Sequence, residues 1–408
     1  AGVGSSDPPP LGPEVSPGRI HVTIPLYYQK YNERVFIMKQ RFKKHVALIL
    51  ISLMLLSLIG CGKPASTETT TTTEAAVTEA PAASISDAAT TADSTSADAS
   101  EEGSDAQTVY PVTVTDQAGR EVTIEKEPES IVSGYYISTS LLLALGLKDK
   151  VTGIEAKASK RPIYKLAAPE FLELPNVGTA KEFDLETCAS LSPELVILPM
   201  KLKDAAQSLS ELDIPVLLVN PESEDQLEQM IELVSTATNT KENADALLSY
   251  IDEKKEMLEK DLSGVDAESV YLAGNSSLLS TAGPAMYQSG LIELAGGKNA
   301  ASEITDTYWA EISYEQLLAW DPSYIILASD AEYTPEDVLN DENLKECTAV
   351  KNGNVYAIPG DIEALDSPVP GGILASIWLA GILHPDQVSA DMYTEEKAAF
   401  YETFYGIK

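Results

Sequence analysis

Lysine, arginine and aromatic side chains directly follow several short apolar runs in this sequence. The first part of the chain has Tyr135, Tyr136, Lys157, Lys160, Arg161, Tyr164, Lys165, Lys201 and Lys203 in such places. The corresponding residues farther along are Asn275, Ser276, Tyr287, Tyr308, Trp309, Asp361 and Glu363. Cationic groups attract anions, and tyrosine and tryptophan offer a flat apolar face with one polar group. These residue types predict a site for a small anionic or planar ligand rather than a centre of covalent chemistry.

The first set of cations stands out against the charge of the whole chain. The sequence has 28 basic and 63 acidic residues and a formal net charge of −35. Seven cations, Lys181 among them, nevertheless fall between positions 157 and 203. Either these cations are scattered and solvated, or they form a basic patch at the entrance of a binding cleft. Such a patch would attract an anion even though the rest of the surface is negative.

Composition excludes several classes of function. A chain of this negative charge is repelled by phosphate backbones, so nucleic-acid binding is not expected. The three histidines are His21, His45 and His384. This scarcity argues against a histidine-rich metal site and against a catalytic pair that uses imidazole as its base. The sequence also lacks the G-x-S-x-G, H-E-x-x-H, P-loop and dinucleotide-binding motifs.

Alternating strands and helices are expected to position these side chains. Apolar runs such as "KVTGI", "ELVILP", "IPVLLVN", "SVYLAG" and "SYIILAS" alternate with helical segments such as "ISTSLLLALGL" and "GILASIWLAGIL". This alternation is typical of an α/β protein with mostly parallel sheets. Ligands of such proteins bind beyond the carboxyl ends of the strands, where the cations and aromatic residues are expected.

Two segments of the sequence form an internal repeat. "DLETCASLSPELVIL" from Asp184 aligns without gaps with "SYEQLLAWDPSYIIL" from Ser313, at an offset of 129 positions. Each segment predicts a short helix that ends before a proline and a buried strand after it. Glu186 and Glu315 occupy equivalent positions in the first helical turn. Acidic side chains in the first turn interact favourably with the helix dipole, and this stabilisation alone is one explanation for the two glutamates.

A helical region is predicted to join two lobes. Residues 224–262 carry an apolar stripe that includes Leu247, Ile251 and Leu258, as expected for a long, stiff helix. The first lobe is assigned to residues 109–223 and the second to residues 263–408. Cys188 and Cys347 fall in different lobes and are expected to be buried free thiols; a disulfide between them, outside the cytoplasm, is the alternative.

The N-terminal part predicts export and lipidation. Residues 38–60 have four basic residues and then an apolar run of 14 residues, from Val46 to Ile59. A membrane span needs about 20, so this run fits a signal peptide. "LIGC" resembles the bacterial lipobox and makes Cys61 the predicted lipidated N-terminus; an ordinary signal peptide or a short transmembrane helix is the alternative. Residues 61–108 then form a predicted disordered tether. Residues 1–37 fit none of this and are assigned to an upstream or artificial segment.

Several motifs together resemble one known family. "LPNVGTAKEFDLETCASLSPELVIL", "LIELAGGKNAA", "ISYEQLLAWDPSYIILAS" and "AVKNGNVYAIPGD" occur in an order similar to that in the substrate-binding lipoproteins of ABC importers for iron chelates, haem and corrinoids. The resemblance implies two Rossmann-like α/β lobes joined by a single long rigid helix, with a ligand cleft between them. It also implies that Glu186 and Glu315 dock onto arginines of the membrane permease. Two tyrosines in "SGYYISTS" and the missing tryptophan and arginine near "EALDSPVPGG" depart from the family pattern.

We therefore expect a monomeric receptor, lipid-anchored to the outer face of the bacterial cell membrane, and not an enzyme. Its expected partners are an ABC permease and its ATPase, and it is expected to carry no built-in cofactor or metal. The expected ligand is a ferric siderophore, preferably anionic, with haem or a corrinoid as alternatives. A secreted hydrolase or chelatase, or an adhesin on a stalk, are alternatives from other classes. The expected ligand-binding residues are Tyr135, Tyr136, Lys157, Lys160, Arg161, Tyr164, Lys201, Lys203, Tyr287, Tyr308 and Trp309.

Overall fold

The computed structural model describes residues 107–305 and 307–408 of the chain. The predicted signal peptide, Cys61, residues 1–37 and nearly all of the tether lie outside the described residues. Within the described ranges, no helix combines the length and apolar character that a membrane span requires.

The first lobe is built on a parallel sheet of four strands. The sheet has the order β4-β3-β5-β6. Its strands are β3 (Ile131–Ser133), β4 (Val151–Ile154), β5 (Leu195–Pro199) and β6 (Val216–Val219). The helices of this lobe are α2 (Tyr136–Ala144), α3 (Pro162–Ala167), α4 (Leu185–Ser190) and α5 (Lys203–Ser210), with short 3-10 turns η2 (Lys148–Lys150), η3 (Ala158–Lys160), η4 (Pro169–Glu173) and η5 (Met200–Leu202). A separate antiparallel pair, β1 (Val112–Thr115) and β2 (Glu121–Ile124), precedes them.

The second lobe repeats the sheet of the first. Its parallel sheet has the order β12-β11-β7-β9 and contains β7 (Glu268–Ala273), β9 (Gly297–Asn299), β11 (Tyr324–Leu327) and β12 (Val355–Ala357). In both lobes the first strand in sequence lies between the second and the third, with the fourth at an edge. The offset of 129 positions carries the start of β5 onto the start of β11. The predicted α/β class with parallel sheets is therefore confirmed.

The remaining elements of the second lobe surround this sheet. They are β8 (Ser280–Ala282), which pairs antiparallel with β10 (Trp309–Glu311), α8 (Tyr287–Leu294), α9 (Tyr314–Trp320), α10 (Pro335–Leu339), α11 (Thr348–Asn352), the turn η6 (Pro370–Gly372), α12 (Ile373–Leu383) and α13 (Ala390–Tyr405).

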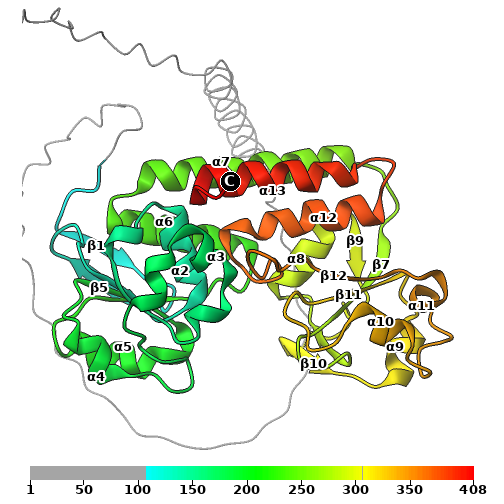
Figure 1. The fold of residues 1–408 in the computed structure, drawn as a ribbon, viewed down its shortest axis with the longest axis horizontal. Helices are drawn as coiled ribbons and strands as arrows, with labels where there is room; N and C mark the ends of the chain where they lie inside the picture. Colours follow the sequence, from blue (N-terminus) through cyan, green and yellow to red (C-terminus); the bar gives the residue numbers. More distant parts are fainter. Residues whose placement is uncertain (1–106, 306) are drawn as a thin grey trace, which may run out of the picture. The chain divides into compact units, whose positions relative to one another are not determined.

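Apolar strands give each sheet two covered faces. Every residue of β5 and of β6 is buried, as expected for parallel strands that are packed on both sides. One face of the first sheet packs against α4 and α5 in a core of its own, and one face of the second packs against α9 to α11 in another (Figure 1). A third and larger core contains residues of both lobes, from α2, α7, α8, α12 and α13.

The connecting region consists of two helices rather than one. α6 (Glu224–Thr238) ends at Asn239, whose left-handed φ of 57° stops the helix, and α7 (Lys241–Asp261) then begins. α7 has 21 residues and buries the predicted stripe that includes Leu247, Ile251 and Leu258. This helix is the stiff connector that was expected.

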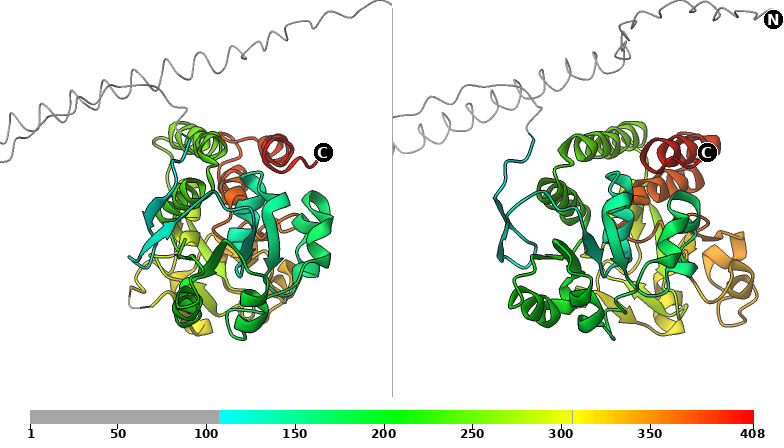
Figure 2. Two further views of the ribbon diagram at one scale, coloured as in Figure 1. Left: turned by 90° about the vertical axis from the view of Figure 1, so that its left-hand side faces the viewer. Right: turned by 60° about the vertical axis from the view of Figure 1, so that its left-hand side comes forward.

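The C-terminal helix adds a second connection between the lobes. α13 lies beside α7 on one side of the body (Figure 1), and the views in Figure 2 agree. Glu396 of α13 accepts hydrogen bonds from Tyr250 and Lys254 of α7, at 2.9 and 2.7 Å. α13 also contacts the first-lobe helix α2. Motion between the lobes must therefore disturb two helices and a shared core.

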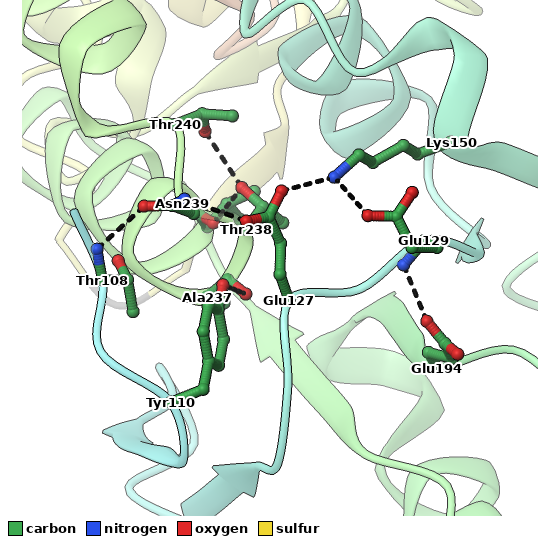
Figure 3. Close-up of polar contacts among 11 residues, drawn as sticks. Thr108, Tyr110, Glu127, Glu129, Lys150, Glu194, Ala237, Thr238, Asn239 and Thr240 are labelled. Carbon is green, nitrogen blue, oxygen red and sulfur yellow. Dashed lines mark hydrogen bonds and ion pairs between the residues drawn. The ribbon is translucent and has the colours of Figure 1, made fainter.

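The first described residues are attached to the α6–α7 junction (Figure 3). The amide of Thr108 donates to Oδ1 of Asn239 at 2.8 Å, and the Tyr110 hydroxyl donates to the carbonyl oxygen of Ala237 at 3.1 Å. Nδ2 of Asn239 donates to Glu127 at 2.9 Å. Asn239 thus connects the first described residues, and the segment that follows β2, to the break between α6 and α7.

Replacement of Asn239 by glycine tests this junction. Glycine keeps the left-handed backbone but removes both side-chain hydrogen bonds, each worth about 0.5 to 1.5 kcal/mol net. We expect N239G to lower the free energy of unfolding by about 1 to 2 kcal/mol in urea titrations. The matched control is D213G, because Asp213 also has a left-handed φ, of 59°, but is exposed. Equal stability of both variants would contradict a stabilising role for the junction.

Candidate ligand-binding site

The strand order gathers the predicted first-lobe residues at one sheet edge. β3 lies between β4 and β5, so Tyr135 and Tyr136, which follow β3, lie between the segments that follow β4 and β5. Lys160 and Arg161 follow β4, and Lys201 follows β5. The carboxyl ends of parallel strands share one edge, so the topology alone brings these side chains to one side of the lobe.

A small cavity between the lobes marks the centre of this region. Its volume is about 20 Å³. The first lobe lines it with Tyr136, Ser140, Lys160, Arg161, Pro162, Ile163 and Tyr164, and the second with Asp330, Gly360, Ile362, Glu363, Ala364 and Val369. The space suits about one water molecule, so a larger ligand would require the lobes to separate.

Tyr136 and Arg161 form the polar wall of the cavity. The guanidinium carbon of Arg161 lies 4.0 Å from the centre of the Tyr136 ring, which is a cation–π contact. The Tyr136 hydroxyl donates to Oγ of Ser367 in the second lobe at 2.6 Å. Arg161 also pairs with Asp330 of the second lobe at 3.5 Å. Burial raises the pKa of Tyr136 to about 12, so its hydroxyl is a protonated donor at neutral pH.

Tyr164 has a supporting position rather than an exposed one. Its side chain is buried, and its hydroxyl donates to Glu155 at 2.6 Å. The same carboxylate accepts a hydrogen bond from Thr139 of α2 at 2.7 Å. Burial raises the pKa of both Tyr164 and Glu155. Tyr164 therefore fixes the segment after β4, and its hydroxyl is already used.

Glu363 forms a buried polar cluster across the lobes. Its carboxylate accepts hydrogen bonds from Ser140 of α2 and from the Tyr401 hydroxyl of α13, the latter at 3.1 Å. The Tyr405 hydroxyl lies 2.9 Å from Oγ of Ser140. Burial raises the pKa of Glu363 to about 7. This carboxyl group therefore changes charge near neutral pH at the meeting point of both lobes.

Three other predicted cations lie on the surface near the same edge. Lys157, Lys201 and Lys203 are exposed, as is Lys160 in the cavity wall. Within residues 107–305 and 307–408, no ion pair includes any of these four lysines. Tyr135 is half-buried against Tyr136, with ring centres 5.5 Å apart. Lys165 and Lys181 are exposed but do not line the cavity.

The predicted residues of the second lobe fall into two groups. Tyr308 and Trp309 are 58% and 40% exposed, and β10, which Trp309 begins, lies on the side of its lobe toward the first lobe (Figure 1). Trp309 packs close to Gly274, just after β7. Asn275 and Ser276 are exposed in the same segment, whereas Asp361 pairs with Lys397 at 2.5 Å.

Tyr287, a predicted ligand-binding residue, lies in the shared core. It is only 5% exposed, and its hydroxyl packs against the backbone of Gly372 at the turn before α12. The first turn of α8 faces this core, which the sequence spacing did not reveal. In this arrangement Tyr287 packs within the core that both lobes share.

The two predicted docking glutamates are exposed at equivalent positions. Glu186 lies in the first turn of α4, which Asp184 caps, and Glu315 lies in the first turn of α9, which Ser313 caps. Hydrogen bonds from a backbone amide and from Ser313 lower the pKa of Glu315. α4 and α9 both lie on the side of the body opposite α7 (Figure 1). A single flat partner surface could contact both.

Cys188 and Cys347 are both buried and free. Burial raises the pKa of Cys188 to about 12, so its thiol is unreactive. Across the residues that the structure describes, no group of three or more His, Cys, Asp or Glu side chains could hold a metal ion.

Sequence reasoning missed two polar residues that line the cavity, Ser140 and Asp330, and also Ser367, which accepts the hydrogen bond from Tyr136. Asp330 follows β11, and the repeat offset of 129 positions pairs it with Lys201 after β5. The internal repeat therefore carried a signal for Asp330. Ser140 lies inside α2, and Ser367 lies in an irregular segment, so their sequence contexts gave no comparable signal.

Replacement of Glu363 by glutamine tests the buried cluster. The folded-state pKa near 7 exceeds the ordinary value of 4.5, so folding takes up a proton between these pH values. The free energy of unfolding of the wild type should therefore fall as pH rises from 4.5 to 7. E363Q should remove about 2 to 3 kcal/mol of this pH dependence in urea titrations at pH 5 and pH 8. E402Q, on the exposed side of α13, should keep it; an unchanged profile in E363Q would contradict the assignment.

The chain matches a known family and its members over most of the body. The periplasmic binding protein family matches residues 131–362, more than half of the chain. The molybdate-binding protein MolA of Haemophilus influenzae is 24% identical over 72% of this chain and 90% of its own length. The uncharacterized ABC transporter substrate-binding lipoprotein YvrC of Bacillus subtilis is 26% identical over 81% and 94%.

A petrobactin-binding relative and a solved structure extend the comparison. The petrobactin-binding protein YclQ of Bacillus subtilis is 23% identical over 63% of this chain and 82% of its own length. A crystal structure of a periplasmic solute binding protein from Veillonella parvula superposes with a TM-score of 0.65 and 26% identity, over 73% of this chain and 93% of that one. The family comprises solute-binding proteins of ABC transporters, which are not enzymes and carry no built-in cofactor. This chain belongs to the periplasmic binding protein family and is an extracytoplasmic substrate-binding protein of an ABC transporter.

Proposed function

We propose that this protein captures an anionic ferric siderophore outside the cell and delivers it to an ABC permease. The cluster of cations at one sheet edge is the observation that carries the proposal. Lys157, Lys160, Lys201 and Lys203 are exposed and form no ion pair within the described ranges, in a chain of net charge −35. The similarity to YclQ, a petrobactin-binding protein, supports a siderophore as the ligand class.

Electrostatic attraction gives this edge its preference for anions. A unit charge 4 Å from one ammonium gains about 4 kcal/mol of gross attraction at an effective dielectric constant of 20, before desolvation. Several unpaired lysines can therefore hold a ligand that carries several negative charges. Tyr308 and Trp309 are exposed on the second lobe and supply flat apolar contacts for the ligand's aromatic or planar groups.

Capture requires a limited separation of the lobes. The cavity of about 20 Å³ is too small for a metal chelate, so the lobes must move apart to admit one. The shared core and the helices α7 and α13 oppose a large rotation. A small opening exposes the wall formed by Tyr136 and Arg161 without unfolding the core. Binding involves no covalent step.

Haem is the alternative ligand that a specific observation favours. The two exposed aromatic residues, Tyr308 and Trp309, suit a broad planar ring, and haem's two propionates would meet the same lysines. A corrinoid is a weaker alternative because it lacks this combination of a flat, exposed ring and two carboxylates.

The surface opposite α7 is the proposed contact with the permease. Glu186 and Glu315 are exposed, equivalent in the repeat and located on the same side of the body. We also propose that the lipid on Cys61 holds the protein at the membrane, within reach of the permease. The name of YvrC, a lipoprotein, supports this attachment.

Neutralisation of two cleft lysines tests the ligand class. We expect the double variant K160Q/K203Q to bind ferric petrobactin about tenfold or more weakly than the wild type in titration calorimetry, because two attractive charges are lost. The affinity of the wild type should also fall more steeply with salt concentration than the affinity of K160Q/K203Q. K260Q/K345Q removes two exposed lysines elsewhere and should bind normally. Equal affinity of the two double variants would refute the proposed site.

Charge reversal at Glu186 and Glu315, on the surface opposite α7, tests the docking assignment. E186K/E315K should abolish uptake of the ligand by cells that contain the permease, because the lysines would repel its arginines. Its affinity for ferric petrobactin in solution should be unchanged. E211K/E336K reverses two exposed acids on the neighbouring helices α5 and α10 and should transport normally. Normal uptake by E186K/E315K would show that these glutamates do not dock.

A further inference from the structure

Besides the buried hydrogen bond from Ser140 to Glu363, three contacts join the lobes around the cavity. The Tyr136 hydroxyl donates to Ser367, Arg161 pairs with Asp330, and the amide of Ile163 donates to the carbonyl oxygen of Ile362 at 3.0 Å. The first partner of each pair lies in the first lobe and the second partner in the second lobe. The contacts therefore have to break, at least in part, when the lobes separate.

The contact between Arg161 and Asp330 is a loose one. Nη1 of Arg161 lies 3.5 Å from Oδ2 of Asp330, which is longer than a good charge-assisted hydrogen bond. The two side chains are 29% and 57% exposed. Among the described residues, no hydrogen bond is donated by the Arg161 side chain, although a guanidinium has five N–H donors. Most of its binding capacity is therefore available to another anion.

Asp330 presents its carboxylate where a ligand anion would bind. It follows β11 in the turn that Ser329 anchors, because the amide of Ser329 donates to buried Asp366 at 3.2 Å. The ring of Tyr136 holds the other side of the Arg161 guanidinium at 4.0 Å. Both partners are thus positioned by their own lobes, and the pair closes the cavity from opposite sides.

We propose that Asp330 is a built-in competitor that occupies Arg161 until an anionic group of the ligand replaces it. The inference rests on the proposed function, because it assumes an anionic ligand at this edge. Exchange of one carboxylate for another at Arg161 leaves the number of ion pairs unchanged. Net attraction must then come from a second anionic group of the ligand, which meets the unpaired Lys160 in the same wall. Asp330 therefore selects chelates with two or more negative groups over monoanions.

Removal of the Asp330 charge should release this contact even without ligand. Hydrogen exchange at the Ile163 amide reports the separation of the lobes, since this amide is bonded to Ile362 across the interface. We expect the Ile163 amide to exchange about two to five times faster in D330N than in the wild type. This factor corresponds to the free energy that an exposed ion pair typically contributes. The control D245N loses an exposed ion pair on α7, with Lys241, and should exchange at the wild-type rate.

Ligand affinity provides the second measurement. D330N should bind ferric petrobactin about two to five times more tightly than the wild type, because the competing carboxylate is absent. In an R161Q background the same substitution should have no effect on affinity, since the competition needs Arg161. Unchanged exchange at Ile163 in D330N, or a gain in affinity that persists in R161Q, would overturn the proposal. If the wild type does not bind ferric petrobactin, the siderophore assignment is wrong, and the exchange measurement alone decides the role of Asp330.

Discussion

One apolar core runs through both lobes, and the geometry of the proposed ligand-binding edge depends on it. Residues of α2, α7, α8, α12 and α13 pack together in this core, whereas each lobe has a separate core on the other face of its sheet. Full burial of one large aliphatic side chain contributes about 1.5 to 3 kcal/mol. A wide opening of the lobes would expose many such side chains at once. The fold therefore resists a large rotation of one lobe against the other.

The polar groups of the interface are arranged around this core according to their distance from solvent. Glu363 is buried against Ser140 and Tyr401 next to the core, whereas Arg161 and Asp330 meet at the more exposed wall. A buried carboxyl group is costly to ionise, and an exposed ion pair contributes little. The inner cluster thus responds to pH, and the outer pair can be exchanged for a ligand at low cost.

The internal repeat provides two matching scaffolds with opposite charges. The offset of 129 positions pairs Lys201 of the first lobe with Asp330 of the second, at the ends of equivalent strands β5 and β11. The same offset pairs Glu186 with Glu315, in the first turns of α4 and α9. The first pair of positions is therefore asymmetric in charge and suited to the proposed ligand. The second pair carries the same charge twice and is suited to the proposed partner with two equivalent contacts.

Local pattern predicted the elements, but packing between distant segments decided several side chains. The apolar runs and the repeat were sufficient to predict both sheets and the edge that carries Tyr136 and Arg161. The burial of Tyr287 depends on Gly372, which is far away in the sequence, and the Tyr164 hydroxyl is bonded to Glu155. Residue type alone predicted neither of these partners. The break at Asn239 lacks a proline or glycine signal.

Native mass spectrometry of the protein purified from cells grown with iron chelates can detect the proposed ligand itself. We expect one intact, anionic metal chelate bound to each protein molecule, and we expect K160Q/K203Q to lose it. A neutral ligand, or an adduct that the double variant retains, would contradict the capture of an anionic chelate by these lysines.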